Sequence, residues 1–188
     1  MWLVLSRIGA IAFTGLAIKI VDDALDGELD RLQGRISLTA GLGDGSSSYT
    51  GILLVLAALL SPVDSISLFA AAYIWGMVRS PRVILPWGAR AWQESLLVAL
   101  AVGAGLGMRP LLGALVLMVA VQGLDDLIDD NPYCIPKWLR WERGALILAL
   151  LVFALYMDGL KTLAVLATAA AVWGTEMVMT GKGRGDKT

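Results

Sequence analysis

The sequence contains no histidine and only one cysteine, Cys134. Without histidine there is no Ser-His-Asp triad and no imidazole ligand for zinc or haem, and a single cysteine excludes an intramolecular disulfide and a thiolate cluster. Charged side chains are also scarce, with 15 basic and 16 acidic residues, and the chain has no long basic run that would indicate binding of nucleic acid. Carboxylates are therefore the main groups left for catalysis or ion binding.

Apolar residues make up 57% of the chain and the mean hydropathy is +0.73, whereas soluble domains are about 45–50% apolar. This composition predicts an all-α, polytopic transmembrane helical bundle. A helix needs about 20 residues to cross the hydrocarbon core, with a usable range of about 17–25. Apolar runs between helix breakers predict seven spans over residues 2–21, 46–61, 62–79, 90–108, 110–128, 141–157 and 159–180. Hairpin turns are expected at Ser61-Pro62, at Met108-Arg109-Pro110 and at Asp158-Gly159.

The basic residues predict the orientation of these spans. Twelve of the 15 lie on one side of the predicted membrane or near it, and only Arg7, Arg109 and Lys161 lie on the other. Because basic residues gather on the cytoplasmic side, the amino terminus is expected outside and the carboxyl terminus in the cytoplasm. Residues 1–180 are then one transmembrane domain, and residues 181–188 are a disordered basic tail at the membrane surface.

Two short segments hold nine of the 16 acidic residues, and each lies at the cytoplasmic end of a predicted span. The segments align without a gap, AIKIVDDALDG (17–27) beside AVQGLDDLIDD (120–130), as a weak internal repeat. Their acidic residues are Asp22, Asp23, Asp26, Glu28 and Asp30 in the first segment and Asp125, Asp126, Asp129 and Asp130 in the second.

Helical spacing places Lys19 and the four aspartates of the first segment on one stripe, and the second segment forms a similar stripe. Like charges near a membrane boundary repel one another and are costly to desolvate, so a cation is expected to hold them. Mg²⁺ is bound in proteins by one or two carboxylates, waters and substrate phosphates. The segments therefore predict a metal-bridged diphosphate site, while the alternative for either segment alone is solvated loop charge.

The sequence resembles the UbiA-type membrane prenyltransferases. Their first motif is N-D-x-x-D-x-x-x-D, and DDALDGELDR (22–31) matches it with Asp22 in place of the asparagine. Their second motif is D-x-x-x-D at the end of a helix four spans later, and DDLID (125–129) matches it. The family has nine helices, and the seven predicted here correspond to its second through eighth, which implies a shortened UbiA-like core.

The resemblance implies a Mg²⁺-dependent transfer of a prenyl group from an isoprenoid diphosphate to an acceptor in the lipid phase, at the cytoplasmic face. The catalytic residues would be Asp23, Asp26 and Asp126. The metal ligands would be Asp22, Asp23, Asp26, Asp30, Asp125, Asp126, Asp129 and Asp130. The bases expected to bind the diphosphate are Lys19, Arg31, Arg35, Arg82 and Lys137. The expected partners are these substrates and membrane lipid.

Two other classes of protein remain open. The CDP-alcohol phosphotransferases use D-x-x-D-G-x-x-A-R followed by further aspartates, and the stretch from Asp23 to Asp44 matches part of this pattern. It departs from the pattern at Asp30, at Ala40 and at Ser48, which stands where that family has its base. A divalent-cation transporter would instead line its path with carboxylates inside the spans.

Overall fold

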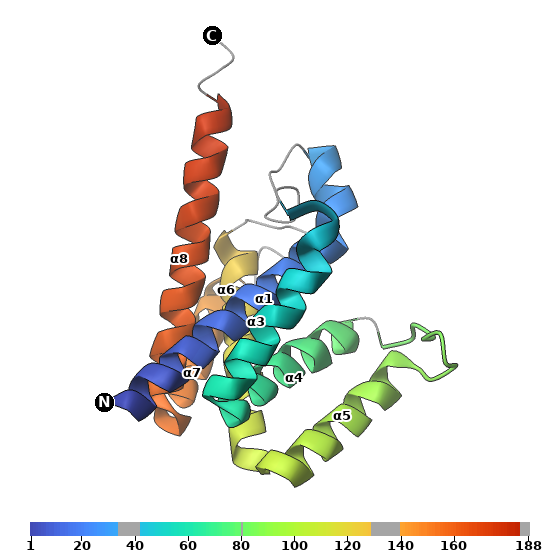
Figure 1. Ribbon diagram of the computed structural model, residues 1–188, viewed down its shortest axis with the longest axis vertical. Helices are drawn as coiled ribbons and strands as arrows, with labels where there is room; N and C mark the ends of the chain where they lie inside the picture. Colours follow the sequence, from blue (N-terminus) through green and yellow to red (C-terminus); the bar gives the residue numbers. More distant parts are fainter. Residues whose placement is uncertain (34–41, 80, 129–139, 185–188) are drawn as a thin grey trace. The chain divides into compact units, whose positions relative to one another are not determined.

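The computed structural model describes residues 1–33, 42–79, 81–128 and 140–184. Within these ranges the chain is all-helical, with seven α-helices and no β-strand (Figure 1). The fold confirms the predicted all-α class. The helices are α1 (Trp2–Gln33), α3 (Ser46–Leu60), α4 (Pro62–Arg79), α5 (Ala91–Leu106), α6 (Met108–Ile128), α7 (Arg140–Met157) and α8 (Gly159–Arg184), with a 3₁₀ turn η1 (Gly43–Gly45) before α3.

The hairpin turns follow from the residues that interrupt the helices. Ser61 separates α3 from α4, and Pro62 occupies the first position of α4, where its missing N–H is not needed. The turn between α5 and α6 lies at Gly107, whose φ of +94° favours glycine. The sequence had placed that turn at residues 108–110, but these residues form the first turn of α6, where Pro110 is tolerated.

Two helices extend beyond their predicted carboxyl-terminal ends. The first helix continues to Gln33, so the whole first Asp-rich segment is helical. The last helix continues to Arg184, past the predicted boundary at 180, and residues 185–188 of the predicted tail lie outside the described residues.

The chain forms two compact units, and the single transmembrane domain predicted over residues 1–180 stays a prediction. The first unit contains Met1–Ser65 and Ala164–Thr188, and the second contains Ile66–Leu163. Helices α4 and α8 each begin in one unit and continue in the other.

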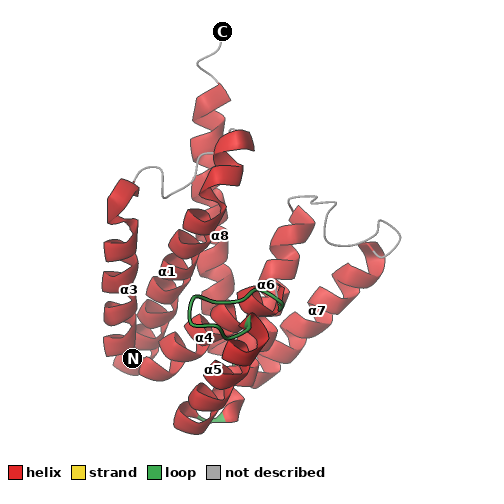
Figure 2. Ribbon diagram, turned by 90° about the vertical axis from the view of Figure 1, so that its right-hand side faces the viewer, coloured by secondary structure: helices red, strands yellow, loops and turns green. Residues whose placement is uncertain are grey.

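In the first unit, α1 and α3 pack side by side (Figure 2). The buried face of α1 carries the small residues Ser6, Ala10, Thr14 and Ala17, three or four positions apart. Gly9 lies so close to α3 that an added Cβ would be 3.0 Å from a methyl group of Leu60. This spacing of small residues lets helix backbones approach closely, as in membrane helix pairs.

In the second unit, α4, α5 and α6 share an apolar core. Ala70 and Ile74 from α4 and Leu111 from α6 are buried, and Val98 and Val102 of α5 pack against them. Helix α6 also packs on α7, where a Cβ at Gly123 would be 3.2 Å from the Ile147 side chain. The second Asp-rich segment therefore begins on a helix that packs against both α5 and α7.

Two of the described helices are long and apolar enough to cross a membrane, over Trp2–Leu25 and Met108–Asp125. Only 28% of each span is buried, whereas the central helix of a soluble domain is mostly covered by protein. The apolar stretches Ser46–Leu60, Ala91–Leu106, Gly144–Met157 and Gly159–Thr175 are shorter. At about 1.5 Å per residue, α3 is about 22 Å long, which is less than the ~30 Å hydrocarbon core.

Candidate functional site

The first Asp-rich segment lies on α1, at the end of a membrane-length stretch. The Asp23 side chain is 5% exposed, and its Oδ1 atom forms an ion pair with Lys19 Nζ at 2.9 Å. Lys19 lies one helical turn before Asp23 on α1. Asp22 beside it is half-buried. A buried carboxylate is stable when a cation neutralises it, and Lys19 supplies this charge to Asp23.

The remaining residues of this segment are placed by their backbone only. Asp26, Asp30 and Arg31 belong to α1, whose helical spacing puts the aspartates one turn apart. Arg35 lies outside the described residues. The helical stripe expected from the sequence is therefore confirmed at the level of the backbone.

The second Asp-rich segment begins at the end of α6. Asp125 is half-buried and closes the second membrane-length stretch, Met108–Asp125. Asp126 is also on α6, with its backbone alone described. The other residues predicted for the site here, Asp129, Asp130 and Lys137, lie outside the described residues.

The metal prediction rests mostly on side chains that are not described. Among the side chains that are described, no group of three or more His, Cys, Asp or Glu could hold a metal ion. Asp22 and Asp23 belong to the first unit and Asp125 to the second. Mg²⁺ binding by the eight aspartates therefore stays a prediction, and the described part of the set is a pair of neighbouring carboxylates on α1 and a single one on α6.

Arg82, the last base predicted to bind diphosphate, lies in the connection between α4 and α5 and is exposed. Close to this connection, Glu94 in the first turn of α5 accepts a hydrogen bond from the Tyr73 hydroxyl of α4. Its Oε2 atom is buried and has no hydrogen-bond partner among the described residues.

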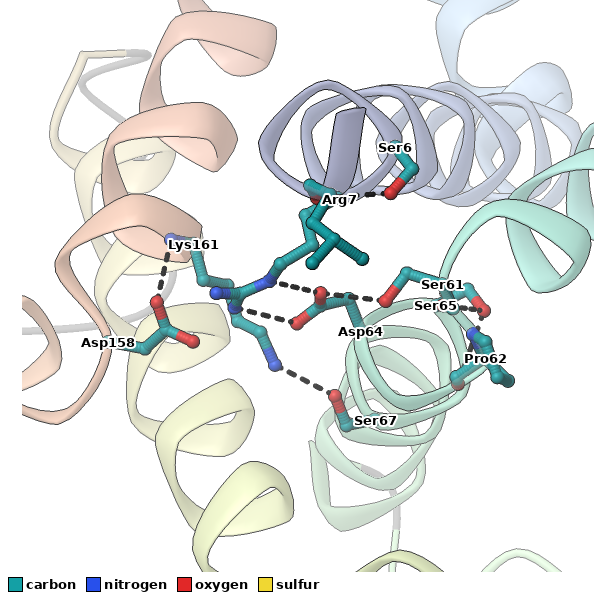
Figure 3. A network of polar contacts seen from close by, with 10 residues as sticks. Ser6, Arg7, Ser61, Pro62, Asp64, Ser65, Ser67, Asp158 and Lys161 are labelled. Atoms are coloured by element: carbon teal, nitrogen blue, oxygen red, sulfur yellow. Dashed lines mark hydrogen bonds and ion pairs between the residues drawn. The ribbon is translucent and has the colours of Figure 1, made fainter. Parts of the chain in front are cut away.

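An ion pair in the first unit was not anticipated from the sequence. Arg7 of α1 donates from Nε to Oδ2 of Asp64 at 2.8 Å and from Nη2 to Oδ1 at 3.2 Å, while Ser61 Oγ donates to Oδ2 at 2.9 Å (Figure 3). The Asp64 side chain is 4% exposed and that of Arg7 is 34% exposed. A bidentate pair of this kind fixes the rotation of both helices. The only local indication of this pair in the sequence is Asp64, an aspartate that follows Ser61-Pro62 in the first turn of α4.

The second unit contains a buried lysine that was also unanticipated. Lys161 of α8 is 4% exposed, and its Nζ donates to Ser67 Oγ of α4 at 3.0 Å. Its backbone N–H donates to Asp158 Oδ1 at 3.1 Å, which satisfies a free donor at the beginning of α8. A buried ammonium needs such hydrogen bonds. Arg7 and Lys161, two of the three bases assigned to the outer side, thus have partners inside the protein.

In the residues that the structure describes, the fold and these sites define an all-helical chain with two membrane-length stretches, each with aspartate in its last turn. Comparison with protein-family models, with curated proteins and with solved structures gives no match. The likeness to the UbiA-type prenyltransferases therefore rests on the two motifs and their predicted topology alone.

Proposed function

We propose that this chain is a multi-pass membrane protein that binds Mg²⁺ and an isoprenoid diphosphate through its two Asp-rich segments and transfers the prenyl group to an acceptor in the lipid phase. The observation that supports the proposal most is the placement of the aspartates. Asp22 and Asp23 lie in the last turn of the membrane-length stretch Trp2–Leu25, and the stretch Met108–Asp125 ends at Asp125, with Asp126 next along α6.

Electrostatics favours a ligand at these positions over simple capping. Asp125 and Asp126 lie in the last turn of α6, where a carboxylate opposes the helix dipole, so this pair does not stabilise its own helix. From residue 19 to residue 31 the first segment carries five acidic residues and only two bases, Lys19 and Arg31. A divalent cation would supply the missing positive charge, and a diphosphate would complete its ligands.

The exposed apolar surface supports insertion of more than two helices. Leu59 of α3, Leu97 of α5 and Leu148 of α7 are each more than 60% exposed. Soluble proteins do not normally expose so many large apolar side chains, whereas hydrocarbon would cover them. In the proposed orientation the amino terminus is outside, and both Asp-rich segments face the cytoplasm.

The test is release of diphosphate from farnesyl diphosphate by the purified chain in detergent with Mg²⁺. Removing one carboxylate from a metal-diphosphate clamp is expected to lower the rate about 100-fold. We therefore expect this loss in Asp23→Asn and in Asp126→Asn, and full activity in the control Asp44→Asn. Wild-type activity in both site variants would overturn the proposal.

The same variants separate the alternatives. A CDP-alcohol phosphotransferase would turn over a CDP-activated lipid, would leave farnesyl diphosphate intact and would need Asp44, which lies in its partial motif. A divalent-cation transporter would show Mg²⁺ flux into liposomes without either substrate. Either result would replace the prenyl-transfer proposal.

A further inference from the structure

The connection between α4 and α5, residues 81–90, is an ordered hairpin rather than an open loop. Leu85 N–H donates to Ala89 O at 2.8 Å and Ala91 N–H donates to Val83 O at 2.9 Å. Ile84 and Arg90 form an antiparallel bridge. Figure 1 shows the hairpin projecting beyond the ends of α4 and α5.

A tight turn at the tip of this hairpin holds a tryptophan outward. Gly88 N–H donates to Leu85 O at 2.8 Å, which closes a four-residue turn with Pro86 and Trp87 at its centre. Proline favours the second position of such a turn, and Gly88, at φ +85°, takes a conformation that favours glycine. The turn therefore fixes Trp87 at the tip.

The hairpin exposes large apolar side chains although it is not a membrane-length helix. Val83 is 51% exposed, Ile84 is 70% exposed and Trp87 is 66% exposed. The apolar surface continues onto α5, where Trp92 and Leu96 are also exposed. This continuity places the hairpin at the edge of the surface that hydrocarbon would cover.

The charge of this region has one sign. No acidic residue lies between Asp64 and Glu94, whereas the hairpin carries Arg82 and Arg90, both with exposed side chains. Exposed arginine beside tryptophan and aliphatic side chains matches the membrane interface, where indoles lie at headgroup level and bases attract anionic lipid. The internal hydrogen bonds of the hairpin lower the penalty for moving its backbone out of bulk water.

We infer that the 81–90 hairpin is a lipid-binding wedge, whose Trp87 and Ile84 enter the interface while Arg82 and Arg90 bind the headgroups of anionic phospholipids. The inference requires the chain to be in a membrane, as proposed above, but it does not require prenyl transfer. It gives Arg82 a lipid phosphate as its partner instead of the substrate diphosphate predicted from the sequence.

The test uses the full chain with Cys134→Ser and Ile84→Cys, labelled at position 84 with the environment-sensitive fluorophore NBD and placed one copy per lipid nanodisc. Phosphatidylglycerol is added in steps to phosphatidylcholine. We expect the NBD emission to shift to the blue as the anionic lipid increases. Each basic residue near an anionic surface contributes about fivefold in affinity, so Arg82→Gln with Arg90→Gln is expected to lower the affinity for anionic lipid about 25-fold and to move the shift to higher phosphatidylglycerol fractions.

Three controls make the result specific. Lys182→Gln with Arg184→Gln removes the same charge from the far end of the chain and is expected to leave the shift unchanged. Trp87→Ser is expected to reduce it. A label at Leu100→Cys, in the middle of α5, reports insertion of that helix and is expected to be blue-shifted in every lipid.

Failure of the inference and failure of the membrane proposal are distinguishable. If the label at position 100 is blue-shifted but the emission of the label at position 84 does not change with anionic lipid, the lipid-binding wedge alone is wrong. If the label at position 100 is exposed to water, both the insertion of α5 and the wedge are wrong. A shift at position 84 seen only when several copies share one vesicle would assign the hairpin to self-association. Reversal of the shift by Mg²⁺ and inorganic diphosphate would assign Arg82 to a soluble ligand, and the inference would again be wrong.

Discussion

Replacing Arg7 by methionine is expected to destabilise the first unit strongly, and a second substitution at Asp64 is expected to restore part of the loss. The Asp64 carboxylate is 4% exposed and accepts two hydrogen bonds from Arg7, so Arg7→Met leaves a buried charge without its guanidinium. Removing one partner from a buried ion pair costs about 3–5 kcal/mol of unfolding free energy. We expect a loss in the lower part of that range, because Ser61 still donates to Asp64.

The reverse substitution is expected to be milder. Asp64→Asn leaves the positive charge on Arg7, whose side chain is 34% exposed and can turn toward water or headgroups. We expect it to cost about 1–2 kcal/mol, since solvent screens a partly exposed charge. In the double variant neither charge remains, so it should be more stable than Arg7→Met alone by about 1–2 kcal/mol.

The assay is reversible unfolding of the full chain in mixed detergent and dodecyl sulfate micelles, followed by circular dichroism. Arg109→Met, which removes an exposed arginine at the beginning of α6, is the control and is expected to change the unfolding free energy by less than about 0.5 kcal/mol. If Arg7→Met behaves like this control, or if the double variant loses the sum of the two single losses, then the pair does not stabilise the unit in the way described.

Three further predictions concern packing and topology. Ser67→Ala removes a hydrogen bond from the buried Lys161 ammonium at 3.0 Å and is expected to cost about 1–2 kcal/mol in the same unfolding assay; an unchanged free energy would mean that this bond contributes nothing. Gly15→Ala forces its Cβ to within 3.0 Å of a neighbouring threonine methyl and should destabilise the first unit by about 1 kcal/mol, whereas Gly51→Ala meets nothing within 4 Å and should be neutral or slightly stabilising; equal effects would contradict the packing of α1. Alkaline phosphatase fused at the amino terminus should be active and a fluorescent protein fused at the carboxyl terminus should fluoresce, and the opposite pattern would reverse the proposed orientation.

The helices could be predicted from the sequence because apolar runs and breakers are local signals. Ser61-Pro62 ends one helix and begins the next without reference to the rest of the chain, and the structure has the turn at that place. The turn lies at Gly107, earlier than the predicted turn at residues 108–110, because Pro110 is inside the first turn of α6 and does not interrupt the helix. Proline is tolerated in the first turn of a helix, and glycine takes the positive φ that the turn requires.

The polar pairs could not be predicted, because they depend on how helices distant in sequence are rotated against one another. Arg7 and Asp64 are 57 residues apart, and Lys161 and Ser67 are 94 residues apart. A count of bases on each side of the membrane treats Arg7 and Lys161 as loop charges and carries no information on their partners. The division into two units could not be predicted from the sequence either, because α4 and α8 each continue from one unit into the other without an interruption of the helix.

The sequence predicts which residues form the candidate site, but it does not predict how these residues come together. The Asp stripe on α1 was expected, and the structure adds that Asp23 is buried and paired with Lys19. That pair is specified by the spacing of four residues on one helix, so a local signal was available. Convergence of the two Asp-rich segments on one ligand depends on tertiary structure and is the central claim to be tested.

The most direct test of this claim is calorimetric titration of the full chain in detergent with inorganic diphosphate, in the presence and absence of Mg²⁺. If the two Asp-rich segments hold one metal-diphosphate ligand together, both segments are needed to bind that ligand. The account therefore predicts binding only with Mg²⁺, and an affinity at least about tenfold weaker in Asp23→Asn and in Asp126→Asn alike. Wild-type affinity in either variant, or binding that does not require Mg²⁺, would contradict it.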